Sequence, residues 1–308
     1  MSIYIFKIPV VELQTREPQY QQDTYVAALF EHNIPMATAA CIPLTQNVRG
    51  KIFKCGGVVD VALYPEGRRK GYAKKLLNHI LLRMNEEEQL FSTLYPFKES
   101  FYEKFGYITF PQVKIANFSP NVLTHLLSAE IEGKVNRYLL KDNFEAYLEI
   151  LHNMQKKIHR LAIKPKYALH QVKDKFNAWF ALATRNGRET GFLLYNVTKP
   201  FEILKVFKFY YEDSETKYLL LKYLAKHVNQ FKEMELELKT DEQIECWFAD
   251  SGAVVKTKSF AASPMGRIVS VEGLSGMIVG TGRFSAKIID SNCEWNNNAY
   301  LFQVMMVI

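Results

Sequence analysis

The chain has 308 residues, a formal net charge of +7 and a hydrophobic content of 48%. This composition excludes a disordered or fibrous protein, and the length exceeds what one hydrophobic core usually serves, so we expect two or three domains. The sequence has neither an apolar stretch of the roughly 18 residues that a membrane span needs nor a secretory signal pattern, which predicts a cytoplasmic protein without a membrane partner.

The positive charge is spread along most of the chain, with clusters only at residues 68–74 and 156–166. Because no basic strand interleaved with aromatic residues and no recognition helix accompanies it, we expect no nucleic-acid partner. The cysteines and histidines lack the spacing of metal ligands or of a disulfide framework, which predicts a protein without a metal ion. Among these residues are the four cysteines, Cys41, Cys55, Cys246 and Cys293, and the histidines His152, His159 and His170.

The first elements in chain order are a hairpin and a longer strand. Residues 24–44 form two apolar runs around His32 and Asn33, which predicts a β-hairpin with these two residues at its turn. Residues 54–64 are rich in β-branched residues and stop at Pro65, which cannot donate a hydrogen bond to a strand ladder.

A helix, a strand and a short helix follow. From residue 69 to residue 89 apolar residues recur every three to five positions, which predicts an amphipathic helix of about five turns that lies on a sheet. We expect a strand at residues 90–97 and a short helix at residues 98–107, where Gly106 is placed to end the helix in a left-handed cap.

The same order of elements recurs in the second half of the chain. A helical connector at residues 143–157 precedes a hairpin whose turn is marked by Asn186 and Gly187. The later elements of this half are expected at residues 202–213 (strand), 214–231 (helix), 233–239 (strand) and 241–250 (short helix). We interpret the chain as two diverged copies of one architecture, although an α+β protein could show this order by chance. After residue 250 a short helix and strands begin a third unit, which is too small to be stable alone.

Residues 65–74, PEGRRKGYAK, place a turn with four cations between a strand and a helix. Backbone N–H groups in such a turn and in the first turn of a helix lack intrachain partners, so they can form an anion site. Gly71 and Ala73 leave room for a phosphate to approach the backbone, and a diphosphate would suit the charge best. The cations are Arg68, Arg69, Lys70 and Lys74.

Other interpretations of this turn differ in strength. The motifs GxxxxGK[ST] and GxGxxG are absent, which excludes a P-loop and a dinucleotide-binding fold. A basic helix start that only faces water is common, but it places cations where the helix dipole repels them. The residues alone favour the anion site and leave the second interpretation open.

The spacing P-x-x-R-x-x-G-x-A, formed by Pro65, Arg68, Gly71 and Ala73, resembles the pyrophosphate loop of the GNAT (Gcn5-related N-acetyltransferase) superfamily. The segment LYPFKESFYEKFGY at residues 94–107 resembles the enhanced intracellular survival (Eis) subfamily. Members of that subfamily have an acetyltransferase domain, a degenerate second acetyltransferase domain and a C-terminal domain similar to sterol carrier protein type 2. The resemblance covers nearly the whole chain.

The resemblance implies an α+β protein with tandem GNAT acetyltransferase folds, which have mixed, mostly antiparallel sheets and flanking helices. We expect a catalytic GNAT domain at residues 1–130, a degenerate GNAT-like domain at residues 131–258 and a partial sterol-carrier-like unit at residues 259–308. The resemblance also suggests assembly into a homo-oligomer.

The same resemblance implies that acetyl-CoA is the co-substrate and that no metal is used. The pantetheine arm is expected to pair with the strand backbone at Val61, Ala62 and Leu63, where a backbone N–H also stabilises the oxyanion. The resemblance assigns to Tyr102 the role of general acid that protonates the departing thiolate, the alternative being an aromatic core residue. The residues expected to hold the diphosphate are Arg68, Arg69, Lys70, Gly71, Tyr72, Ala73 and Lys74.

The sequence thus predicts an acetyl-CoA-dependent N-acetyltransferase that acts on a primary amine of a small molecule or of a lysine side chain. The general base is open between Asp60, the carboxylate of Ile308 and neither, so a non-catalytic coenzyme A or acyl-binding protein is the alternative function. The second copy carries acids at the corresponding turn, which predicts one coenzyme A per chain. These acids are Glu212, Asp213 and Glu215.

Overall fold

The computed structural model describes residues 23–111, 113–175, 178–199, 201–239, 242–247, 256–259, 263–277 and 282–303. The chain forms two compact units. The first contains Met1–Phe110, Ile158–Ala168 and Pro264–Ile308, and the second contains Pro111–Lys157 and Leu169–Ser263. Segments from separate parts of the sequence therefore build each unit.

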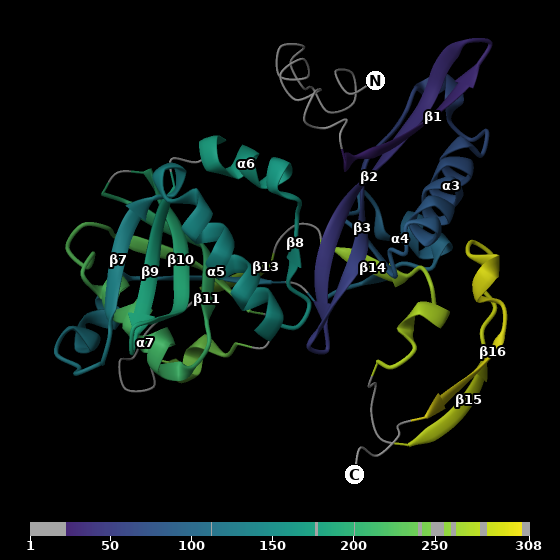
Figure 1. Cartoon of the computed structure of the whole chain (residues 1–308). Helices are drawn as coiled ribbons and strands as arrows, with labels where there is room; N and C mark the ends of the chain where they lie inside the picture. Colours follow the sequence, from purple (N-terminus) through teal and green to yellow (C-terminus); the bar gives the residue numbers. More distant parts are fainter. Residues whose placement is uncertain are drawn as a thin grey trace. The chain divides into compact units, whose positions relative to one another are not determined.

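The first unit is built on a mixed sheet. Its strands are β1 (Tyr25–Glu31), β2 (Ile34–Val48), β3 (Lys51–Leu63), β4 (Phe91–Leu94), β5 (Ile108–Thr109), β8 (Ala162–Ile163) and β14 (Met265–Ile268). The strand order is β1-β2-β3-β4-β14-β5, and β8 also pairs with β2 (Figure 1). β3 and β4 are parallel, whereas the other pairs are antiparallel. A separate two-stranded sheet is formed by β15 (Arg283–Lys287) and β16 (Ala299–Gln303).

Two consecutive hairpins build the first three strands. The predicted turn at His32 and Asn33 is confirmed, since these residues have φ of 50° and 63° and join β1 to β2. Positive φ at both central residues gives the turn a twist that matches the flanking strands. β2 then continues to Val48 and returns as β3 through Arg49 and Gly50. The sequence analysis missed this second hairpin, because polar residues interrupt the apolar pattern around its turn.

α3 (Tyr72–Glu86) connects β3 to β4 and packs on the sheet (Figure 1). Its buried face consists of Leu76, Leu77, Ile80, Leu81 and Met84, as the apolar spacing predicts. The helix begins later than residue 69, because Arg69 and Gly71 have left-handed backbone with φ of 61° and 78°. The turn before the helix is therefore longer than expected.

The segment after β4 is a short helical turn. α4 (Glu99–Tyr102) continues as a 3-10 turn (Glu103–Phe105), and Gly106 follows with φ of 77°. This confirms the left-handed cap that the position of Gly106 predicts.

The C-terminal segment completes the sheet of the first unit. β14 lies between β4 and β5 and pairs with both strands. Its backbone hydrogen bonds therefore attach this part of the predicted unit at residues 259–308 to the first unit. The resemblance of residues 259–308 to sterol carrier proteins stays a prediction.

The second unit is built on another mixed sheet with the order β13-β6-β12-β11-β10-β9-β7. Its strands are β6 (Lys114–Phe118), β7 (Lys134–Leu139), β9 (Trp179–Arg185), β10 (Arg188–Lys199), β11 (Ile203–Tyr211), β12 (Glu233–Leu238) and β13 (Lys256–Ser259). Its helices include α5 (Phe144–Lys157) and α7 (Ser214–Ala225), and α6 (Lys166–Lys175) spans the boundary between the units. Since β6 pairs with β12, residues 114–118 lie in the second compact unit, and the predicted domain limit at residue 130 stays a prediction.

Helices cover both faces of the second sheet. Phe192 of β10 contacts Tyr147 of α5, whereas the next residue, Leu193, lies in the core that α7 covers. Successive residues of a strand point to opposite faces, so α5 and α7 lie on opposite sides of the sheet.

The two units repeat one arrangement. In the first, β1, β2, β3, α3 and β4 follow one another, with antiparallel, antiparallel and parallel pairings. In the second, β9, β10, β11, α7 and β12 follow one another with the same pairings. This confirms the repeat and the mixed α+β fold predicted from the order of elements.

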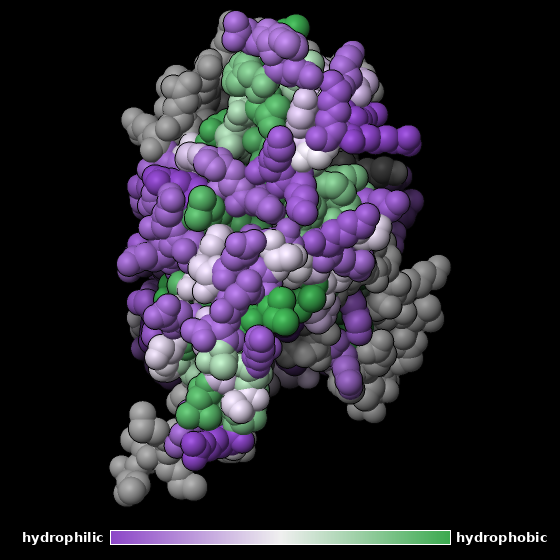
Figure 2. Space-filling view, turned by 90° about the vertical axis from the view of Figure 1, so that its right-hand side faces the viewer, coloured by the Kyte–Doolittle hydropathy of each residue, from purple (hydrophilic) through white to green (hydrophobic). Residues whose placement is uncertain are grey.

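None of the helices in the part of the chain that the structure describes is both long and apolar enough to cross a bilayer. Among the coloured residues in Figure 2, hydrophobic side chains form small groups between hydrophilic ones.

The start of α7 is capped by a side chain. Asp213 accepts a hydrogen bond from the backbone N–H of Thr216 at 2.8 Å. Arg185 of β9 forms ion pairs with Asp213 and Glu215 at the same place. An amide of the first turn and the charge of the cap are therefore both satisfied within the unit.

We expect Asp213→Ala to lower the free energy of unfolding by about 1 kcal/mol, because it removes the cap of α7. Denaturant unfolding followed by circular dichroism measures this loss. Ser214→Ala changes the neighbouring exposed residue, which does not cap the helix, and serves as the matched control. Equal stability of the two variants would contradict the assigned cap.

Candidate functional site

The charged turn links the end of β3 to the start of α3. It contains a 3-10 turn (Pro65–Gly67) held by hydrogen bonds from Gly67 N to Tyr64 O at 3.0 Å and from Arg68 N to Pro65 O at 3.1 Å. Pro65 ends the strand ladder, and the left-handed residues after Gly67 redirect the chain into α3. Local backbone geometry therefore fixes this turn.

The first turn of α3 has no side-chain cap. Gly71 occupies the N-cap position, and the first helical hydrogen bond runs from Lys75 N to Gly71 O at 3.1 Å. Within the described ranges, the amides of Tyr72, Ala73 and Lys74 therefore have no hydrogen-bond partner. A Cβ built on Gly71 would meet nothing within 4 Å, so no other group crowds the N-cap position. The residues present fit an anion such as a diphosphate.

The cations of the turn are unequal in their contacts. Arg68, Arg69 and Lys74 are exposed and have no ion-pair partner in the described part of the chain. Lys70 instead pairs with Glu31 at the end of β1, with 2.9 Å between Nζ and Oε2. Hydrogen bonds from Lys70 and Tyr72 hold the pKa of Glu31 below its usual value. Sequence analysis missed this acid, because nothing local marks a contact 39 residues away.

The C-terminal half of β3 extends beyond its partner on one side. The parallel ladder with β4 runs only from the pair Cys55–Phe91 to the pair Gly57–Thr93, whereas β3 continues to Leu63. In the described residues, the backbone at Val61, Ala62 and Leu63 thus has a strand neighbour only on the β2 side. An extended ligand can pair with such a free edge.

A β-bulge interrupts the other side of β3. Thr38 pairs with Ala62 and Ala40 pairs with Val59, so Asp60 and Val61 lie opposite the single residue Ala39. Asp60 has φ of 52°, a left-handed conformation that is uncommon outside glycine. Bulges of this kind occur next to active sites and redirect side chains there. The sequence signal that could have marked this bulge is Asp60, a polar residue inside an apolar run.

Tyr102 lies in the core of the first unit, and its side chain is 3% exposed. Its ring contacts Phe97, Phe101 and Tyr107 at centroid distances of 5.6, 5.0 and 6.0 Å. The described residues offer its hydroxyl no hydrogen-bond partner. Burial raises the pKa of Tyr102 to about 12, so the phenol stays protonated at neutral pH.

The structure brings several of the predicted site residues into one core. Val61, Leu63 and Tyr72 pack as half-buried residues against the cluster that contains Tyr102 and Ala37. The uncapped turn, the free strand edge and the tyrosine therefore belong to one unit. Ile308 lies outside the described residues.

The corresponding turn of the second unit differs in its charge and its contacts. α7 starts with the side chain of Asp213 at the place where α3 offers only backbone amides. Glu212, the preceding residue, forms ion pairs with Lys157 and Arg188. Carboxylates thus occupy the anion position of the second copy.

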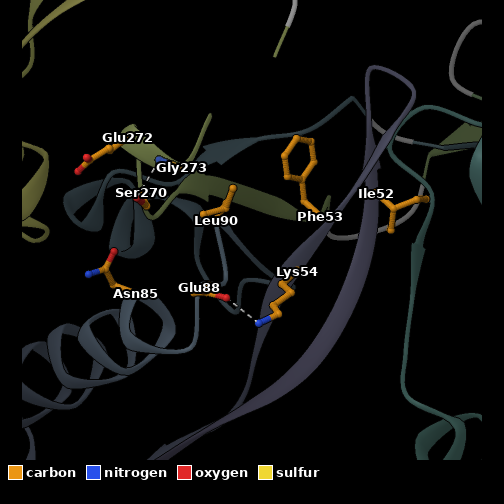
Figure 3. A pocket seen from close by; sticks show the side chains of 9 residues that line it. All are labelled: Ile52, Phe53, Lys54, Asn85, Glu88, Leu90, Ser270, Glu272 and Gly273. Atoms are coloured by element: carbon orange, nitrogen blue, oxygen red, sulfur yellow. Dashed lines mark hydrogen bonds and ion pairs between the residues drawn. The ribbon is translucent and has the colours of Figure 1, made fainter. Parts of the chain in front are cut away.

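A pocket of about 510 Å³ lies elsewhere in the first unit (Figure 3). Two of its lining residues, Lys54 at the start of β3 and Glu88 beyond the end of α3, form an ion pair at 3.0 Å. The lining residues are Ile52, Phe53, Lys54, Asn85, Glu88, Leu90, Ser270, Glu272 and Gly273. None of the predicted site residues lines this pocket, which lies at the opposite end of both elements from the charged turn.

The described thiol and imidazole groups form no candidate metal site. The described residues contain no group of three or more His, Cys, Asp or Glu that could hold a metal ion. Cys41, Cys55 and Cys293 are free and buried, and burial raises the pKa of each thiol to about 12. The ring nitrogens of His152 and His159 contact backbone groups of Leu148 and Arg49. The side chains of Cys246 and His170 lie outside the described residues.

Solved structures share the fold at low sequence identity. A GCN5-related N-acetyltransferase from Anabaena variabilis ATCC 29413 has a TM-score of 0.80 and 15% identity, over 98% of this chain and 78% of that chain. A probable N-acyltransferase from Enterococcus faecalis V583 has a TM-score of 0.78 and 18% identity, over 97% and 77% of the two chains. Eis1 from Mycobacterium abscessus has a TM-score of 0.68 and 14% identity, over 90% and 73%.

Sequence comparison identifies the family. No curated protein matches the sequence. Two family models do match it, at residues 2–110 and 162–268, and each is described as an acetyltransferase (GNAT) domain. Together the matches cover more than two thirds of the chain and include both copies of the repeated arrangement. The chain therefore belongs to the GNAT acetyltransferases and is an enzyme with two GNAT domains.

Proposed function

We propose that the protein is an acetyl-CoA-dependent N-acetyltransferase that acylates a primary amine of a small molecule or of a lysine side chain. The observation that carries this proposal is the uncapped start of α3, where three free backbone amides meet exposed cations. A diphosphate satisfies such amides and interacts favourably with the helix dipole. The capped start of α7 lacks this property, so one coenzyme A per chain is expected.

The free edge of β3 supplies the second part of the proposed site. The backbone at Val61, Ala62 and Leu63 can pair with the amide groups of a pantetheine arm as an added strand would. A backbone N–H of this edge would then donate to the oxygen of the thioester carbonyl and stabilise the negative charge that develops there. The strand thus orients the acyl group.

Tyr102 supplies the proton in the proposed reaction. A neutral amine attacks the thioester carbonyl, a C–N bond forms, and the C–S bond breaks with its electron pair on sulfur. The phenol of Tyr102 then gives its proton to the thiolate, and the nitrogen loses a proton to a base. Because a thiol has a pKa of about 8.5, below that of the buried phenol, this transfer is uphill, and the phenolate takes a proton back from solvent to close the cycle.

Asp60 is the proposed base within the described residues. Its bulge lies in the strand that holds the acyl group, and its side chain is half-buried. Thiol release from acetyl-CoA with polyamines, aminoglycosides and lysine peptides as acceptors tests the function, and release with none of these amines would argue against the proposal.

We expect Tyr102→Phe to lower kcat by about a hundredfold or more, because the variant lacks the proton donor and keeps the aromatic ring. Steady-state thiol release measures kcat, and equilibrium dialysis measures coenzyme A affinity, which should not change. Phe101→Leu changes the neighbouring aromatic residue and controls for altered packing. Unchanged turnover of Tyr102→Phe would remove Tyr102 from the reaction.

The pH profile provides an independent test of Tyr102. Burial raises its pKa from 10.0 to about 12, so the protonated form predominates over the whole range below that value. We therefore expect kcat/KM to rise as the amine loses its proton and to show no decline from Tyr102 up to pH about 11. A decline between pH 7 and pH 9 that disappears in Tyr102→Phe would contradict this assignment.

We expect Arg68→Glu combined with Arg69→Glu to weaken coenzyme A binding by about tenfold to a hundredfold at low salt, and by less at high salt. Lys70 is left unchanged because Glu31 already pairs with it. Equilibrium dialysis at two salt concentrations measures the effect. Reversal of Lys51 and Lys164, two other exposed lysines of the first unit, changes the net charge equally and is the control. Equal affinity of the two double variants for coenzyme A would contradict the proposed diphosphate site.

A further inference from the structure

Side chains from the C-terminal segment hold the short turn that follows Tyr102. The carbonyl oxygen of Phe105 accepts a hydrogen bond from the guanidinium of Arg267, which lies on β14. The carbonyl oxygen of Lys104 accepts one from Asn292 Nδ2 at 3.1 Å. The last carbonyls of a helical turn lack partners within it, so these two donors act as its C-terminal cap. They come from positions 162 and 188 residues further along the chain.

Arg267 is a buried cation, and only 3% of its side chain is exposed. In addition to the hydrogen bond with Phe105, its Nε donates to the carbonyl oxygen of Ile268 at 3.1 Å. Its Nη2 forms an ion pair with Asp290. A buried guanidinium is stable only when its charge and its N–H groups are satisfied together. The contact with the turn is therefore part of a closed network that fixes the position of Arg267.

Asp290 connects both donors. Its Oδ2 pairs with Arg267, and its Oδ1 accepts hydrogen bonds from the backbone N–H groups of Asn292 at 3.1 Å and Cys293 at 3.0 Å. The same carboxylate therefore orients the guanidinium and the loop that presents the Asn292 amide. We name Arg267, Asp290 and Asn292 the rear clamp.

Gly106 makes room for the rear clamp. A Cβ at this position would lie 3.3 Å from Arg267 Nη1, and the backbone there has φ of 77°. The left-handed cap that the sequence predicts thus serves two purposes, since it ends the turn and admits the guanidinium to the Phe105 carbonyl.

The turn held by the rear clamp also fixes Tyr102. Tyr107 N donates to the carbonyl oxygen of Tyr102 at 3.3 Å, and the Tyr107 hydroxyl forms a hydrogen bond of 2.6 Å with Ser92 on β4. The rings of Tyr102 and Tyr107 lie edge to face. The backbone of Tyr102 is therefore fixed through Tyr107, which β4 anchors, and through the turn that the rear clamp holds. The Tyr102 hydroxyl has no hydrogen-bond partner in the described residues.

We propose that Arg267, Asp290 and Asn292 are positioning residues for acetyl transfer, which hold the turn after Tyr102 so that the phenol reaches the departing sulfur. This inference rests on the proposed role of Tyr102. It extends the acetyltransferase site beyond the first matched domain, which ends at residue 110, into the C-terminal segment. Displacement of a catalytic group by about 1 Å can cost as much as a hundredfold in rate.

Asn292→Ala and Arg267→Lys test the clamp in the intact chain. The first removes one neutral donor, and the second keeps the charge but loses the planar fork of donors. We expect each to lower kcat by about tenfold, with coenzyme A affinity changed less than twofold. In combination with Tyr102→Phe, either variant should lower kcat no further than Tyr102→Phe alone, because both act through the same group. Ser270→Ala removes a backbone cap elsewhere in the same segment and should leave kcat unchanged.

The outcomes separate this proposal from the role of Tyr102. A large effect of Tyr102→Phe with wild-type kcat in both clamp variants overturns the clamp and leaves the acid in place. Losses that multiply in the double variants also overturn it, because they indicate a general structural role. Wild-type kcat in Tyr102→Phe overturns the acid and the clamp together. Thermal unfolding identifies a variant that fails to fold, and if Arg267→Lys does so, the Asn292→Ala pair decides the question.

Discussion

The proposed chemistry depends on one constraint, which is that a helix begins with backbone amides that its own sequence leaves without partners. Gly71 gives α3 such a start, because it supplies no side chain and adopts the left-handed conformation that turns the chain into the helix. In the second unit the same arrangement of strands leads to α7, where Asp213 fills the position. The same architecture thus leaves the first amides of the helix uncapped in one copy and capped by a carboxylate in the other.

The other parts of the site follow from how the sheet of the first unit is built. β4 is short, so β3 has a free edge beyond Gly57, and the bulge at Asp60 changes the strand direction beside that edge. The chain then returns through α4, which places Tyr102 in the same core. The C-terminal segment adds β14 to the sheet and the rear clamp to the turn after Tyr102. Distant parts of the sequence therefore meet around the turn that follows Tyr102.

Local sequence patterns predicted the helices, strands and turns better than the contacts between residues that are distant in the sequence. The turn at His32 and Asn33, the apolar face of α3 and the cap at Gly106 all depend on residues close in sequence, and the structure confirms them. The contact of Lys70 with Glu31 and the capping of Phe105 by Arg267 depend on tertiary packing, so no local signal could show them. The predicted domain limits differ from the compact units for the same reason, since β6 and β14 each pair with strands far along the chain.

Calorimetric titration of the intact protein with coenzyme A tests the central claim most directly. Because the start of α3 is open and the start of α7 is filled by its own aspartate, the account predicts one molecule bound per chain. The absence of any heat of binding, or a stoichiometry of two, would contradict it.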